Sequence, residues 1–140
     1  MSEHWSGGIY TKPQDEKTHI LLTRTSLTAE WSLPGGKQSD ENESPMATFV
    51  REIYEEISCV AWAGLLILKV SEPEHLRYVF ELEPQTEIKE SDTIQFFPLI
   101  RLPENLRERH KQILCCLYKD LIRNERKLLR AKLQPLSLAA

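Results

Sequence analysis

Apolar and polar residues come in short alternating blocks along the chain, and these blocks predict strands and helices in mixed order. Short runs of apolar and β-branched residues, bounded by polar or turn-forming residues, indicate strands at residues 6–10, 19–24, 60–70, 77–83 and 94–99. Polar segments, several containing proline, indicate turns or loops at residues 12–17, 25–31, 38–43, 71–74 and 84–92. The glycine- and proline-containing run at residues 32–37 interrupts any regular structure.

Two segments carry helical signals. Ser44 and Pro45 fit the N-cap and first position of a helix that should end near Ile57. Pro103 is expected to open a second helical stretch, which Pro135 ends at the latest; its apolar face comprises Leu106, Ile113, Leu114, Leu117 and Leu121. The mixture of strands, at least one hairpin and helices predicts an α/β (α+β) domain with a mixed sheet and helices on both of its faces.

The first predicted helix concentrates acidic residues. On a helical wheel its three glutamates fall within about 100° of one another, and these are Glu52, Glu55 and Glu56. The opposite face is expected to be the core face and comprises Val50, Ile53, Tyr54 and Ile57. Neighbouring like charges destabilise a helix unless a cation binds them, and carboxylate oxygens are ligands that Mg²⁺ prefers. The alternative is an ordinary solvated helix face.

Composition and charge narrow the function classes. The 140 residues, 41% of them hydrophobic, fit one domain with a real core. No apolar run is long enough to span a bilayer and no secretory signal is visible, so we expect a cytoplasmic protein. A net charge of −3 gives no reason to expect general nucleic-acid binding. The three cysteines Cys59, Cys115 and Cys116 fit neither a disulfide framework nor a zinc site and are expected to be apolar fillers.

The segment from Leu33 to Glu56 resembles the Nudix box. The run Leu33-Pro34-Gly35-Gly36-Lys37, a polar loop with Glu43, and then Arg51-Glu52-Ile53-Tyr54-Glu55-Glu56 follow the family pattern. Two positions depart from it: the loop between Gly36 and Glu43 is one residue longer, and Ser58 stands where the family has glycine. The resemblance extends over most of residues 6–122 and implies a Nudix-type α/β/α sandwich with a mixed β-sheet.

The resemblance also implies roles for particular residues. The glutamates that match the family's metal ligands are Glu52, Glu55 and Glu56, with Glu43 as a further ligand or as the partner of Arg51. Gly36 would shape the loop at the metal and substrate, and Lys37 or Arg24 would contact phosphates unless they are surface charges. Glu90 is the candidate base from a later loop, with Glu87 as its rival and a solvated acidic loop as the alternative for both. The implied cofactor is Mg²⁺, for which Mn²⁺ could substitute.

The implied activity is hydrolysis of a pyrophosphate bond in a nucleoside diphosphate linked to another moiety. Two alternatives stay open: a non-catalytic module that senses a nucleotide, and a pyrophosphohydrolase acting on RNA 5′ ends. The RNA alternative depends on the basic residues of the stretch 123–132, which equally fit a solvated helix end. We expect one Nudix domain over residues 1–140, with residues 123–140 as a helical C-terminal extension. Leu128, Leu129 and Leu133 in this extension suggest packing against something, such as a second subunit in a homodimer.

Overall fold

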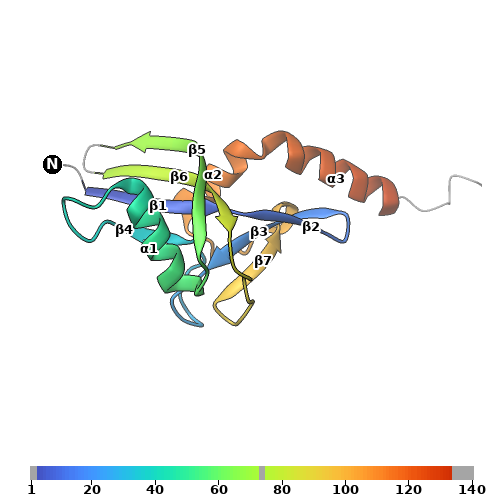
Figure 1. Ribbon diagram of the computed structural model, residues 1–140. Helices are drawn as coiled ribbons and strands as arrows, with labels where there is room; N and C mark the ends of the chain where they lie inside the picture. The colour runs from blue at the N-terminus through green and yellow to red at the C-terminus, as the bar shows by residue number, and fades with distance from the viewer. Residues whose placement is uncertain (1–2, 73–74, 134–140) are drawn as a thin grey trace, which may run out of the picture.

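The computed structural model describes residues 3–72 and 75–133. In chain order the elements are β1 (Glu3–Ile9), β2 (Thr11–Gln14), β3 (Lys17–Thr23), β4 (Gly35–Lys37), α1 (Pro45–Ile57), β5 (Ala61–Ser71), β6 (His75–Pro84), β7 (Ile94–Pro98), the 3₁₀ turn η1 (Leu99–Arg101), α2 (Glu108–Leu117) and α3 (Lys119–Leu133). Figure 1 shows their arrangement. Every expected strand is present, with bounds shifted by a few residues.

The strands form two sheets. One has the order β4-β1-β6-β5, in which β1 and β6 run parallel and the other pairs run antiparallel, so it is a mixed sheet as predicted. The second sheet, β2-β3-β7, is antiparallel throughout. The parallel β1–β6 pairing joins two distant parts of the chain and places the N-terminal strand at the centre of the mixed sheet, next to β4.

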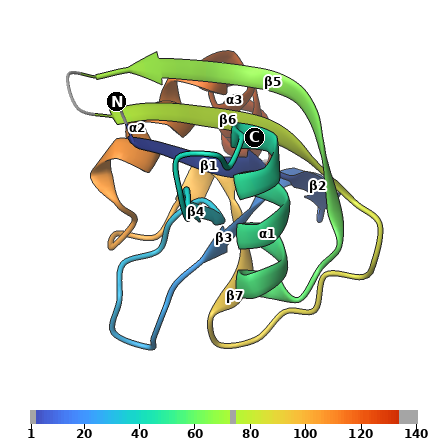
Figure 2. The ribbon, with the colours of Figure 1, turned by 60° about the vertical axis from the view of Figure 1, so that its left-hand side comes forward.

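Helices cover both faces of the sheets, which gives the expected α/β/α layering. In Figure 2, α1 stands in front of the mixed sheet while α2 and α3 lie behind it. The strands supply both cores because successive side chains point to opposite faces: Phe80 and Leu82 pack toward α1, while Val79 packs in the cluster that contains Leu114 of α2 and Ile122 of α3.

The segment 12–17 differs from its predicted turn, because Thr11 to Gln14 form β2. Pro13 lies opposite Thr18 in the antiparallel pair, and β2 is an edge strand, where a residue without an N–H group is tolerated. The turn itself is shorter than predicted. It consists of Asp15 and Glu16, whose φ angles of 51° and 64° are those of a tight hairpin.

The prediction that Pro103 opens a helix was wrong. The backbone after Pro103 is used in a different pairing: Trp31 N–H donates to the Asn105 carbonyl at 2.9 Å, and Arg107 N–H donates to the Trp31 carbonyl at 2.8 Å. This pairing holds residues 103–107 in a turn, so α2 begins at Glu108. The helix is also interrupted at Tyr118, so the expected single helical stretch is divided into α2 and α3.

Some predicted features lie partly or wholly outside the residues that the structure describes. The predicted turn at 71–74 includes residues 73 and 74, and the predicted stop at Pro135 also lies outside the described residues. Among the cysteines only Cys59 is buried; Cys115 and Cys116 are exposed, so the expectation that all three are core fillers was wrong. No helix in the described ranges is long and apolar enough to cross a membrane.

Candidate active site

Helix α1 begins and ends where its sequence predicts. The Ser44 hydroxyl accepts the Ala47 N–H at 3.1 Å, and Pro45 opens the first turn. At the other end Ser58 adopts a left-handed conformation (φ 53°) and donates its N–H to the Tyr54 carbonyl at 2.9 Å. Serine thus takes the geometry that glycine usually supplies at this position, and the departure from the family pattern leaves the helix end intact.

The predicted core face of α1 was partly wrong. Ile53 and Ile57 are buried as expected, but Val50 and Tyr54 are 38% and 57% exposed. The prediction left out Phe49, which is fully buried and has its ring centroid 5.6 Å from that of Phe80. Because Phe49 turns the helix toward the sheet, Glu52 and Glu56 lie beside the buried stripe instead of opposite it.

Gly35 and Gly36, which were expected to interrupt regular structure, instead begin the short strand β4, which pairs with β1. The chain at these two residues, just after the bend at Pro34, is called the glycine turn below.

Glu56 faces the glycine turn from a partly buried position. One of its carboxylate oxygens, Oε2, accepts the Gly35 N–H at 3.0 Å and the Thr23 hydroxyl at 3.3 Å. The pKa of Glu56 is raised to about 7, mainly by burial and also by the charge of Glu52. The Gly35 N–H, the Thr23 hydroxyl and the charge of Arg107 act in the opposite direction. A cation beside this carboxyl would stabilise its charged form.

Glu52 meets the same turn one residue further along. A β-carbon built on Gly36 would lie 2.3 Å from the Glu52 carboxyl carbon. Gly35 is equally confined, since its β-carbon would lie 2.4 Å from the Ser6 carbonyl oxygen. The two glycines therefore let the turn come close enough for both carboxylates to contact it.

Arg51 organises the acidic residues around it. Its guanidinium donates to both oxygens of Glu43, at 2.8 and 2.9 Å, to Glu52 at 2.8 Å and to the Lys37 carbonyl at 2.8 Å. It also reaches Glu55 at 3.2 Å, although the Glu55 side chain is 56% exposed. The Arg51 guanidinium holds the pKa of Glu43 well below its usual range.

Glu43 is also fixed from its other side. Its Oε1 accepts the Thr48 hydroxyl at 2.7 Å and the Ser39 N–H at 2.9 Å. Because the Thr48 proton is donated to Glu43, the Thr48 oxygen is left to accept from His4 Nε2, 2.9 Å away. The loop with one extra residue is thus tied to β1 and α1, and the oxygens of Glu43 are occupied by these contacts.

The remaining candidates lie in different surroundings. Glu90 accepts the Phe96 N–H at 3.3 Å, and within the described chain no hydrogen bond or ion pair connects it to Glu52 or Glu56. Arg24 donates to the Asp92 and Leu27 carbonyls, both at 2.9 Å, and lies over the Trp31 ring. Lys37 lines a pocket of about 240 Å³ together with Trp5, Arg77 and Arg107.

Several residues at this site were not predicted from the sequence. Thr23, His4, Thr48 and Arg107 each act through a contact that joins parts of the chain far apart in sequence. Such contacts depend on the pairing of β1 with β4 and on the docking of α1. A single sequence carries no local pattern for either.

The donors at the turn suit a hard divalent cation. Within residues 3–72 and 75–133 no three His, Cys, Asp or Glu side chains are grouped as a metal cage. Mg²⁺, however, is usually bound by one or two carboxylates and keeps several positions for water and substrate phosphates. Glu52 and Glu56, both in contact with the Gly35–Gly36 turn, fit this ligand set.

Comparisons with known proteins agree with this geometry. The family model described as NUDIX domain matches residues 8–117. Among curated proteins, no match to this chain was found.

Solved structures share the fold at low sequence identity. An ADP-ribose pyrophosphatase from Streptococcus suis 89-1591 is 22% identical, with a TM-score of 0.62 and coverage of 86% of this chain and 93% of that one. A putative nudix hydrolase family member from Chromobacterium violaceum is 19% identical, with a TM-score of 0.67 and coverage of 94% and 90%. The NUDIX domain of Shewanella oneidensis NrtR, complexed with ADP ribose, is 19% identical, with a TM-score of 0.60 and coverage of 86% and 89%.

The box residues, their convergence on the glycine turn and the match over residues 8–117 lead to one conclusion: the chain belongs to the Nudix family of pyrophosphate-bond hydrolases.

Proposed function

We propose that this protein hydrolyses the pyrophosphate bond of a nucleoside diphosphate linked to another moiety, and that it depends on Mg²⁺. The observation that carries the proposal is the meeting of Glu52 and Glu56 at the Gly35–Gly36 turn. Two carboxylates held beside the same pair of glycines repel each other, and a divalent cation removes this repulsion.

Each residue then has a defined task. Glu52 and Glu56 hold the cation, which when bound would neutralise charge on the phosphate oxygens. Arg51 fixes Glu52, and Glu43 fixes Arg51 through the paired contacts at 2.8 and 2.9 Å. Glu43 therefore serves better as a positioning residue than as a ligand. Glu55 and Glu90, both exposed carboxylates, are the candidates for taking the proton of the attacking water.

The neighbouring pocket supports a nucleotide derivative as substrate. Lys37, Arg77 and Arg107 outnumber the one acidic residue, Glu3, in the lining of this pocket, and the Arg107 charge acts on Glu56. The Trp5 ring, 8% exposed, forms part of its wall. Cations suit the diphosphate and the aromatic ring suits a base or sugar. Two of the structural relatives are associated with ADP-ribose by their own descriptions, which makes ADP-ribose the first compound to test.

A substrate panel tests the proposal. The purified protein is incubated with Mg²⁺ or Mn²⁺ and with ADP-ribose, nucleoside triphosphates, oxidised nucleotides, dinucleoside polyphosphates or triphosphorylated RNA, and products are read by mass. We expect turnover of at least one small nucleotide derivative. Glu56→Gln should lose on the order of 100-fold or more of that turnover with the fold intact, whereas Glu104→Gln, an exposed glutamate elsewhere, should not.

The panel also separates the two alternatives. Tight binding of one nucleotide without turnover of any compound would favour a sensing module, and turnover of RNA alone would favour 5′-end processing. Unchanged turnover in Glu56→Gln would contradict the role of the carboxylate pair.

A further inference from the structure

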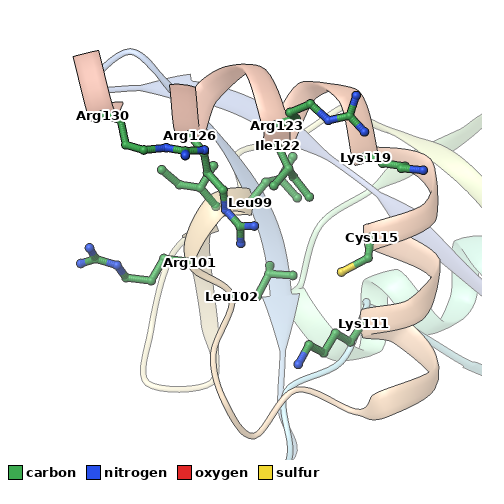
Figure 3. A pocket seen from close by; sticks show the side chains of 11 residues that line it. Leu99, Arg101, Leu102, Lys111, Cys115, Lys119, Ile122, Arg123, Arg126 and Arg130 are labelled. Carbon is green, nitrogen blue, oxygen red and sulfur yellow. The ribbon is translucent and has the colours of Figure 1, made fainter. Parts of the chain in front are cut away.

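A second pocket lies on the other side of the molecule from α1, between η1, α2 and α3. Its volume is about 510 Å³, and Figure 3 shows the side chains around it. Its floor is apolar and includes Leu99, Leu102 and Ile122. Around this floor stand six cationic side chains: Arg101, Lys111, Lys119, Arg123, Arg126 and Arg130.

Positive charge in this pocket is not balanced by its own lining. Among the residues that the structure describes, no aspartate or glutamate lines it. Of its six cations only Arg123 forms an ion pair with a described residue, a long contact of 3.9 Å to the exposed Asp120. The whole chain carries a net charge of −3, so this local excess of positive charge has the opposite sign to the charge of the protein as a whole. An anion placed among them would relieve their mutual repulsion.

The six cations come from three elements: Arg101 from η1, Lys111 from α2 and the other four from α3. Lys119, Arg123, Arg126 and Arg130 follow one another at spacings of three or four residues and therefore share one face of α3. In Figure 3 the Arg126 guanidinium reaches down from α3 toward Leu99 and Leu102, and Lys111 extends toward the same hollow from α2. The Arg101 guanidinium turns away from the hollow in this view, so Arg126 and Lys111 are the cations that reach into it. Charge inside a hollow suits a compact ligand, whereas a flat basic surface suits a polymer.

We propose that this pocket binds a compact soluble ligand that carries several phosphate groups. The cations recognise the phosphates, and the apolar floor accommodates the remainder of the molecule. A volume of about 510 Å³ lies within the range of small-molecule sites. Neither Glu52 nor Glu56 lines this pocket, so the site is separate from theirs, and the proposal concerns binding alone.

Calorimetric titration with inorganic tripolyphosphate tests the proposal. The buffer contains EDTA, which removes divalent cations from the carboxylate site, and binding that survives Arg126→Glu is assigned to the pocket of Lys37, Arg77 and Arg107. Arg126→Glu should weaken binding at least about tenfold. Lys127→Glu, the matched control, makes the same charge change at the next position of α3, which does not line the pocket, and should weaken binding far less. Glu56→Gln should bind the probe as the wild type does, so failure of the hydrolase assignment would leave this result unaffected.

The wild-type chain supplies a second test that needs no variant. Cys115 lines the pocket and its sulfur points into the hollow, while the adjacent Cys116 is exposed outside it. Tripolyphosphate should slow alkylation of Cys115 by iodoacetamide and leave Cys116 unchanged, as measured by peptide mass. The experiment is repeated with ATP, which carries three phosphates and an organic part. Protection at a lower concentration than with tripolyphosphate would show that the apolar floor adds affinity.

Three outcomes would overturn the proposal. The first is no binding of tripolyphosphate or ATP and no protection of Cys115. The second is equal weakening by Arg126→Glu and Lys127→Glu, which would indicate diffuse charge attraction. The third is single-stranded RNA binding far more tightly than either compact probe with the same sensitivity to Arg126→Glu, which would make the pocket part of a nucleic-acid surface.

Discussion

Single residues at the glycine turn decide whether the acidic site can form. Gly36 is the sharpest case, because any β-carbon there would overlap the Glu52 carboxylate. Glu52 also has little freedom to retreat, since Arg51 holds its Oε1 at 2.8 Å. The glycine is therefore required by contact with a functional side chain and not by the bend of the chain alone.

Gly36→Ala should displace Glu52 and lower turnover on the order of 100-fold, since small displacements of catalytic groups cost about that much. The matched control is Gly64→Ala in β5, where the new β-carbon meets the end of the exposed Glu83 side chain, which can move away. Turnover is measured on the substrate found in the panel, with circular dichroism as a check of folding. Equal activity in the two variants would contradict the role given to Glu52.

His110 should make folding sensitive to acid. Its Nδ1 accepts the Leu33 N–H at 2.9 Å, and burial lowers its pKa to about 3, with the charges of Arg107, Arg77 and Arg109 adding to the effect. Below pH 6.5 the unfolded chain takes up a proton at this histidine and the folded chain does not, so its contribution to stability falls from pH 6.5 toward pH 3. Glu56, with its raised pKa, acts in the opposite direction, and His4, with a lowered pKa, acts in the same direction as His110.

Comparison with a variant isolates the His110 contribution from those of Glu56 and His4. The free energies of unfolding of wild type and His110→Gln are measured in urea between pH 7 and pH 5. The variant is expected to be less stable at pH 7, and the gap should narrow by about 1.4 kcal/mol per pH unit once the pH is well below 6.5. A gap that stays constant with pH would show that His110 takes up its proton at the same pH in the folded and the unfolded chain, so that burial does not lower its pKa.

At the scale of elements, α1 shows which features are local in the sequence. Its two ends depend on Ser44, Pro45 and Ser58, and these residues act on the backbone within one helical turn, so both ends could be predicted. Its buried face was predicted only in part: Phe49, Ile53 and Ile57 recur at every fourth position, but Phe49 was left out and the exposed Val50 and Tyr54 were included. The start of α2 at Glu108 could not be predicted, because it depends on the pairing of residues 105–107 with Trp31. The glutamates were therefore identified, but their surroundings were not.

The two capping serines of α1 should respond in opposite ways to substitution. Ser44→Ala removes the acceptor of the Ala47 N–H and should destabilise the protein by about 1 kcal/mol. Ser58→Gly relieves a positive φ angle of 53° and should stabilise it by about 0.5–1 kcal/mol. Urea unfolding of both variants is the measurement. A destabilised Ser58→Gly would show that the serine side chain contributes more than its backbone conformation costs.

At the scale of the whole molecule, α3 belongs to the packed structure although the family match ends at residue 117. Ile122 lies in the core cluster of α2 and is 8% exposed. Glu125 accepts the Thr18 N–H at 2.7 Å, which ties α3 to the β2–β3 hairpin. Leu128 and Leu133, by contrast, are 62% and 70% exposed, and the homodimer suggested by this segment stays a prediction.

Removing α3 should therefore unfold more than a tail. A chain ending at Tyr118 loses the burial of Ile122 and the charged hydrogen bond of Glu125, together worth about 3–5 kcal/mol, a large share of the 5–15 kcal/mol typical of a domain.

Ile122→Ala in the full chain should cost about 2–4 kcal/mol, and Leu128→Ala, at an exposed position of the same helix, less than about 0.5 kcal/mol. If thermal unfolding showed the shortened chain to be as stable as the full one, residues 119–133 would be an appendage, and loss of phosphate binding on truncation could be assigned to the pocket alone. If it is destabilised as expected, only point variants can separate binding at α3 from folding.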